Sequence, residues 1–138
     1  MNNPSLSPSG SDRQEPNLIY PRPYRKCGSL LFLSGVGPSS RLLKADTDAP
    51  LATPGFAAQC DAAFAALDSV LTAGGSSRAE VSDVTVFLTD IAGNYEIFCG
   101  KWASFFAGIE FEPCRTTVQI VALVGGNAIE MKAIASVA

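Results

Sequence analysis

The chain has 138 residues, of which 47% are hydrophobic and 17% are charged, a length and composition that suit one globular domain with its own core. The net charge of −3 argues against nucleic acids and anionic membranes as partners, because both require a basic surface. No apolar run approaches the roughly 20 residues of a membrane span, and the polar segment 1–15 lacks the apolar region of a secretory signal, so we expect a cytoplasmic protein.

The absence of histidine and the spacing of the cysteines limit which catalytic and metal-binding sites this chain can form. There is no histidine, which removes the commonest general base and metal ligand. The four cysteines are widely spaced without a C-x-x-C pair, and a zinc site would require all of them to converge: Cys27, Cys60, Cys99 and Cys114. We therefore expect reduced, mostly packed thiols, no metal and no cofactor.

Residues 1–16 are rich in serine, proline and asparagine, and we expect a flexible tail that precedes a domain over residues 17–138. Residues 17–20 are expected to form a short first strand. Segment 21–26 is basic and contains two prolines that forbid a helix. It is either a solvated loop or a positive rim that steers an anionic small molecule.

The continuous apolar run 30–35 predicts a buried strand. The clearest helix follows, with Thr53 as its N-cap and Pro54 at its first position. Its apolar stripe has helical spacing and comprises Phe56, Cys60, Ala63, Phe64, Leu67, Val70 and Leu71. Gly74 and Gly75 are expected to end this helix through a positive φ.

Residues 81–90 alternate as a strand, and Asn94 is predicted to cap a second helix that ends at Gly108. One side of this helix is heavily aromatic and carries Tyr95, Phe98, Cys99, Trp102, Phe105 and Phe106. That side is expected to be core, with part of it lining a pocket or a subunit contact. The last strand is expected over residues 128–137.

Between these elements, Pro113 stops the preceding segment and an alternating run follows it, so a strand is expected here. One face of that strand carries Arg115, Thr117 and Gln119, and the other carries Thr116, Val118 and Ile120. We expect the valine and isoleucine face to join the core, because the arginine face cannot be buried without partners.

The planar fork of Arg115 can hold a carboxylate or a phosphate by two parallel hydrogen bonds. One interpretation is a structural salt bridge to Glu112 or Glu130. The other is a bound anionic ligand.

The expected order is strand, strand, helix, strand, helix, strand, strand. It favours an α+β fold in which a single mixed sheet carries two helices on one face. The turn at 125–127 is expected to join the last two strands as a hairpin. Arg115 and Glu130 would then lie at opposite ends of it, so a site that uses both would be completed across a subunit interface.

Four segments, taken together, resemble one known family. They are Leu33-Ser34-Gly35, residues 84–90, Pro113-x-Arg115-Thr116-x-Val118, and residues 129–135. In order and spacing they resemble the Rid (YjgF-type) family of enamine/imine deaminases, over residues 18–137. Segments 20–28 and 34–38 look closest to members described as 2-aminomuconate deaminases.

The resemblance implies a chorismate-mutase-like fold assembled as a homotrimer with clefts between subunits. It implies that Arg115 holds the substrate carboxylate and that Glu130 positions the attacking water. Tyr24, Ser34 and Gly35 would line the same cleft. Two further substrate-binding positions depart from archetypal members: Cys99 stands where many have asparagine, and Thr117 replaces a cysteine.

The implied activity is a metal-independent hydrolysis of 2-aminomuconate to 4-oxalocrotonate (2-oxohex-3-enedioate) and ammonia. Arg115 would take one carboxylate, and Arg22, Arg25 or Lys26 the other. Three alternatives stay open: a general 2-iminoacid or enamine deaminase, a trimer that binds small carboxylates without turning them over, and a purely structural trimer.

Overall fold

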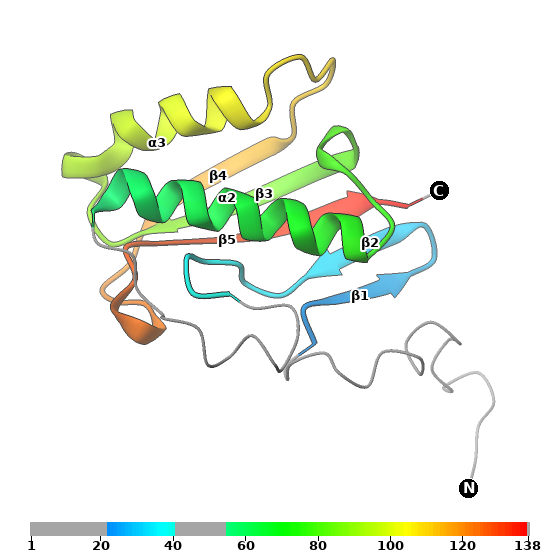
Figure 1. Cartoon of the computed structure of the whole chain (residues 1–138), viewed down its shortest axis with the longest axis horizontal. Helices are drawn as coiled ribbons and strands as arrows, with labels where there is room; N and C mark the ends of the chain where they lie inside the picture. Colours follow the sequence, from blue (N-terminus) through cyan, green and yellow to red (C-terminus); the bar gives the residue numbers. More distant parts are fainter. Residues whose placement is uncertain (1–21, 41–54, 138) are drawn as a thin grey trace, which may run out of the picture.

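Both long helices lie on the same face of one five-stranded sheet, as Figure 1 shows. The computed structural model describes residues 22–40 and 55–137. This arrangement confirms the expected α+β fold with a single mixed sheet. The expected tail over residues 1–16 and the strand at 17–20 lie outside the described residues.

The strands are β1 (Tyr24–Cys27), β2 (Leu30–Leu33), β3 (Val81–Leu88), β4 (Cys114–Gln119) and β5 (Ile129–Ser136). Their order across the sheet is β1-β2-β5-β3-β4. Neighbours pair antiparallel except β3 and β4, which are parallel. The strand that carries Arg115 is therefore an edge strand.

The predicted hairpin between the last two strands is wrong, because β3 lies between β4 and β5. A helix connects β3 to β4, and such a crossover returns the chain so that the second strand runs parallel to the first. The glycine-rich turn does follow β4, with positive φ values of 79° at Gly125 and 74° at Gly126. It leads the chain to the far side of β3 instead of folding it directly back.

Helix α2 spans Phe56–Ala73 and buries most of the predicted stripe against the sheet, namely Cys60, Ala63, Phe64, Leu67, Val70 and Leu71. The N-cap is Gly55, so the helix begins later than predicted. The expected cap and first residue, Thr53 and Pro54, lie outside the described residues. At the other end, Gly75 supplies the positive φ, 85°, that turns the chain out of the helix.

Helix α3 spans Ile91–Phe105, and its N-cap is Asp90 and not Asn94. The Asp90 Oδ1 atom accepts a hydrogen bond from the backbone N–H of Gly93 at 3.0 Å, which satisfies one of the free donors at the start of the helix. A β-carbon at Gly93 would clash with the same carboxylate. The carboxylate that directly precedes the first turn is therefore the cap.

Two predictions near the N-terminus need correction. Residues 24–26, expected within a basic loop, belong to β1 because their backbone pairs with β2. The apolar run that follows is not buried on both sides: Leu31 and Leu33 are buried, while Leu30 is 39% and Phe32 is 37% exposed. Helices cover only one face of the sheet, so only alternate side chains of β2 are buried.

The sheet thus has a helix-covered face and an open face. The open face carries Arg25, Cys27, Leu30, Phe32, Asp83, Thr85, Phe87, Cys114, Thr116, Val118, Glu130, Lys132, Ile134 and Ser136. Side chains on the opposite face, with those of α2 and α3, form the core. None of the helices in ranges 22–40 and 55–137 is long and apolar enough to cross a membrane.

Candidate active site

The side chain of Arg115 lies on the helix-covered face of β4, which reverses the predicted assignment of the two faces. Val118, expected in the core, is 36% exposed on the open face. Arg115 and Thr117 are the half-buried residues of the strand. The reversal has a physical reason: the aromatic side of α3 offers the guanidinium π faces, so the arginine face can be covered without a carboxylate.

Three rings of α3, which we call the aromatic bed, hold the guanidinium of Arg115. Its Cζ atom lies 4.9 Å from the ring centroid of Trp102, 5.3 Å from that of Phe98 and 5.8 Å from that of Tyr95. The Nη2 atom also donates a hydrogen bond to the hydroxyl oxygen of Tyr95 at 2.9 Å. These contacts fix the orientation of the fork on the edge strand.

Neither predicted salt bridge of Arg115 forms. Among the described residues, no ion pair joins it to Glu112, to Glu130 or to any other carboxylate; the ion pair seen there joins Lys101 to Asp61. Its Nη1 and Nε atoms have no acceptor in ranges 22–40 and 55–137. The guanidinium is therefore oriented by rings but not neutralised, which leaves it able to bind an external carboxylate.

Two of the predicted substrate-binding residues lie beside Arg115. The Cys99 sulfur lies 3.9 Å from Nη2 of Arg115. The Thr117 hydroxyl oxygen is buried and has no hydrogen-bond partner within the described part of the chain. A buried polar atom without a hydrogen-bond partner raises the free energy of the folded state. A ligand or a water that formed a hydrogen bond with this hydroxyl would therefore bind favourably. Arg115, Cys99 and Thr117 thus form one cluster between β4 and α3.

A second group lies on the open face around Glu130, which is half-buried. Its carboxylate packs directly against Gly35, where a β-carbon would lie 2.6 Å from Oε2 of Glu130. The Ser34 hydroxyl donates a hydrogen bond to the carbonyl of Arg22 at 2.5 Å. The structure therefore brings Gly35 to Glu130, whereas the Ser34 side chain bonds to the backbone before β1; neither residue contacts Arg115 among the described residues.

The remaining predicted residues, all on β1, lie on different faces of the sheet. The Tyr24 side chain is 3% exposed and belongs to the hydrophobic core, so it lines no surface of this subunit. Arg25 is exposed and faces the open side, opposite Phe32 on β2. Lys26 faces the other side, where its Nζ atom would lie 3.8 Å from a β-carbon at Gly75. Of these two basic residues, only Arg25 shares a face with Glu130.

One subunit does not bring Arg115 and Glu130 together. In the sheet register Arg115 lies beside Val84 of β3, whereas Glu130 lies beside Phe87 on the other edge of that strand. The offset is about 10 Å along the strands and about 10 Å across them. Their side chains also point to opposite faces of the sheet. A site that used both residues would therefore need a second subunit, although not for the predicted reason, because β4 and β5 form no hairpin.

The comparisons with known proteins agree with this architecture. Residues 13–137 match the family model described as Endoribonuclease L-PSP. The chain belongs to this family. Among solved structures, YEO7 of yeast is 30% identical, with 84% of this chain and 86% of that chain covered and a TM-score of 0.73. A member of the Rid protein family from Yersinia pestis, YyfA, is 27% identical and has a TM-score of 0.76. The match covers 86% of this chain and 90% of YyfA.

RidA from the Antarctic bacterium Psychrobacter has the same fold, with a TM-score of 0.73, 24% identity, and 83% and 86% of the two chains covered. A comparison with curated proteins gives no match. The predicted Rid family is thus confirmed. The 2-aminomuconate subtype is a finer assignment that these similarities do not reach.

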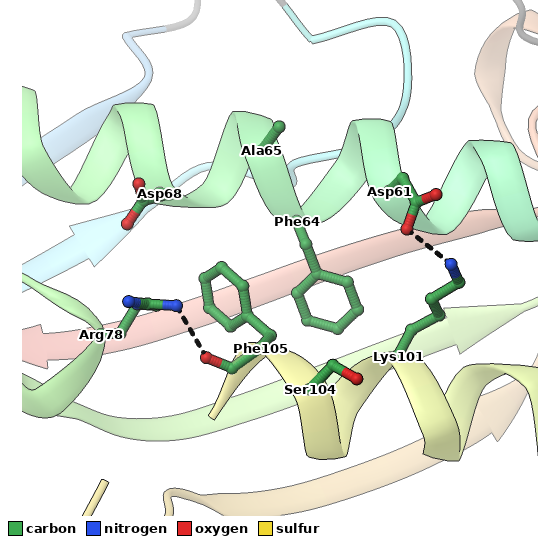
Figure 2. A pocket seen from close by; sticks show the side chains of 8 residues that line it. All are labelled: Asp61, Phe64, Ala65, Asp68, Arg78, Lys101, Ser104 and Phe105. Carbon is green, nitrogen blue, oxygen red and sulfur yellow. Dashed lines mark hydrogen bonds and ion pairs between the residues drawn. The ribbon is translucent and has the colours of Figure 1, made fainter. Parts of the chain in front are cut away.

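This Rid-family chain has a hollow of about 420 Å³ between α2 and α3, on the flank of α3 that faces away from Arg115. Figure 2 shows Phe64 and Phe105 at its floor, with the ion pair of Asp61 and Lys101 (2.8 Å) at one end. At the other end Arg78 donates to the backbone carbonyl of Phe105 at 3.0 Å. No predicted site residue lines this hollow, and its two cations already have partners.

The cysteines are less uniformly packed than predicted: Cys60 is buried, Cys99 is half-buried, and Cys27 and Cys114 are exposed free thiols. Burial, with a smaller contribution from the neighbouring Asp61 carboxylate, raises the pKa of the Cys60 thiol to about 12. The described residues contain no group of three or more potential metal ligands.

The aromatic bed is the part of the site that sequence reasoning missed. Tyr95, Phe98 and Trp102 were expected to be core residues, with part of the face lining a pocket or a subunit contact. The usable signal was their spacing, which places all of them on one side of α3, together with an arginine that faces a helix-covered layer. A cation over such a face is a common arrangement.

Proposed function

We propose that this protein is a metal-independent deaminase that hydrolyses an enamine or imine bearing a carboxylate. One observation carries the proposal: the guanidinium of Arg115 is fixed on the aromatic bed but has no anionic partner among the described residues. A half-buried arginine without a counter-ion is suited to hold a substrate carboxylate. The buried, unpartnered Thr117 hydroxyl beside it offers a further contact.

The chemistry needs few groups. The enamine tautomerises to the imine, water adds to the imine carbon, and the carbon–nitrogen bond breaks to release ammonia and a 2-oxo acid. Arg115 would hold the carboxylate next to the reacting carbon, and orientation of this kind can contribute roughly 7–11 kcal/mol to lowering a barrier. Glu130, supplied by a neighbouring subunit, would position the water and transfer its protons.

The substrate that this proposal favours is 2-aminomuconate, which would give 4-oxalocrotonate and ammonia. Its second carboxylate needs a second cation, and Arg25 is the candidate because it is exposed on the open face; it lies two strands and four residues from Glu130 of its own chain, so it too would act across a subunit interface. A simple 2-iminoacid has no group for Arg25 to bind. The relative kcat/KM of the two substrates therefore distinguishes this assignment from a general iminoacid deaminase.

The proposed assembly is a homotrimer whose subunits pack through the open face. That face exposes large apolar side chains, including Leu30 (39%), Phe32 (37%) and Val118 (36%). Exposed apolar surface of this kind favours self-association. Light scattering at micromolar concentration should give three times the subunit mass, and a monomer would contradict both the trimer and the shared site.

The test is ammonia release by the full-length chain from 2-aminomuconate and from a 2-iminoacid generated in the assay. We expect turnover that survives chelators and that Arg115→Ala removes. Binding of a small carboxylate without ammonia release would indicate a non-catalytic binding trimer. Because the family description names an endoribonuclease, a single-stranded RNA is a third arm. Cleavage of that RNA without ammonia release would replace the deaminase proposal.

A further inference from the structure

The ring of Tyr95 does more than support Arg115. We infer that the Tyr95 hydroxyl is a second donor to the substrate carboxylate, so that the substrate is held by a clamp made of an arginine on β4 and a tyrosine on α3. This inference rests on the proposed deaminase function. It assigns a direct substrate contact to a residue that the sequence motifs do not include.

The hydrogen bond between the two side chains sets the direction of the hydroxyl proton. Nη2 of Arg115 donates to Oη of Tyr95 at 2.9 Å, so this oxygen acts as the acceptor. A phenol has one O–H bond, and that bond must point away from the guanidinium. No acceptor for it lies in ranges 22–40 and 55–137. The proton is therefore available to a ligand bound beside Arg115.

The position of the ring favours the same role. Tyr95 is 38% exposed, whereas Phe98 and Trp102, the other members of the aromatic bed, are 0% and 6% exposed. The two buried rings suffice to cover the inner side of the guanidinium. Tyr95 stands at the rim, where its hydroxyl meets both the guanidinium and the solvent from which a substrate arrives.

The helix that carries Tyr95 is tied to the strand that carries Arg115. The backbone N–H of Ile91, at the start of α3, donates to the Gln119 side-chain oxygen at 2.8 Å. Gln119 lies on the same face of β4 as Arg115, so this bond fixes the register of helix and strand. Both donors of the clamp are thus held in place before a ligand binds, which lowers the entropy cost of binding.

A clamp of one cation and one neutral donor recognises a carboxylate rather than a neutral carbonyl. Its contribution is the same in the ground state and in the transition state, because the carboxylate does not react. Loss of the hydroxyl should therefore raise KM and leave kcat nearly unchanged.

The sharpest test is Tyr95→Phe, which removes the hydroxyl and keeps the ring over Arg115. The single tryptophan, Trp102, lies 4.9 Å from the guanidinium, so its fluorescence reports ligands at this site without turnover. Pyruvate, the product of 2-iminopropionate hydrolysis, is the probe. We expect the Kd for pyruvate and the KM for the imine to rise roughly tenfold or more in the variant, as loss of a hydrogen bond to a charged group predicts.

Ser104→Ala is the matched control, since Ser104 lies on the flank of α3 that faces away from Arg115. It should leave Kd, KM and kcat unchanged. An unchanged Kd and KM in Tyr95→Phe would overturn the clamp, as would a lower melting temperature with normal binding, which indicates a structural role. Neither result touches the deaminase proposal, which fails separately if the wild-type chain releases no ammonia from any imine.

Discussion

Replacing Arg115 separates its contribution to binding from its contribution to stability. Loss of a hydrogen bond to a charged group costs about 1.5–3 kcal/mol, which corresponds to a roughly 10- to 150-fold fall in kcat/KM. Misorientation of the imine carbon should add to this. The stacking on Trp102 and Phe98 contributes separately to the folded state, by about 1–2 kcal/mol for a partly desolvated cation.

Two substitutions therefore give different results. Arg115→Ala should lose both contributions, so its melting temperature and its kcat/KM should both fall. Arg115→Lys keeps a cation near the aromatic bed and should retain much of the stability, but an ammonium cannot hold a carboxylate by two parallel bonds. Its kcat/KM should stay close to that of the alanine variant.

The assay measures ammonia release and the thermal midpoint on the same preparations, with the trimeric fraction isolated first. If Arg115→Lys restores turnover, the fork geometry is irrelevant and a point charge suffices. If folded Arg115→Ala turns over normally, the arginine is only a structural residue that stacks on α3, and the proposed mechanism is wrong.

Three further predictions concern other parts of the molecule. Gly35→Ala should lower kcat without unfolding the chain, because its β-carbon would displace the Glu130 carboxylate. Gly100 on α3 has open space around it, so the control Gly100→Ala should instead raise the unfolding free energy by about 0.5–1 kcal/mol. Activity assays and chemical denaturation of both variants check these outcomes. Cys60 should resist iodoacetamide at pH 8 until the protein is denatured, because its side chain is 0% exposed and burial raises its pKa to about 12; mass spectrometry of the labelled peptide decides. Arg25→Ala should raise KM for 2-aminomuconate far more than for a monocarboxylate imine, and equal effects would mean that this residue does not contact the substrate.

Local patterns in the sequence predict much of this fold. The stripe from Cys60 to Leu71 identifies α2, and the alternation of Val84, Val86 and Leu88 identifies β3, because both patterns record which side chains face a core. The loop before β4 follows from Pro113. These features depend on residues that are close in the sequence, so the spacing of the apolar residues is enough to identify each helix or strand.

Local sequence patterns do not predict which strands pair with each other. Whether β4 lies beside β5 or beside β3 depends on the crossover through α3, and the alternation within β4 is the same in both cases. The assignment of its two faces failed for a related reason. Hydrophobicity favours Val118 as the buried side chain, but the aromatic bed makes burial of the Arg115 face favourable.

Some residues predicted for the site lie near one another, but they form two groups on opposite faces of the sheet. Arg115, Cys99 and Thr117 do lie together, and Gly35 does lie against Glu130. Tyr24 was expected to line the cleft, but its ring packs in the core, since it pairs with Leu33 on the helix-covered face. A side chain's face depends on strand register, which its neighbours in sequence do not reveal.

The central claim is that Arg115 of one subunit and Glu130 of another complete a single site. Two inactive variants, Arg115→Ala and Glu130→Gln, test it when equal amounts are unfolded together and refolded as mixed trimers. Random assembly leaves about one quarter of the interfaces with both native residues, so ammonia release should recover to about one quarter of the wild-type rate. If the mixed trimers form and stay as inactive as the separate variants, Arg115 and Glu130 do not act across a subunit interface.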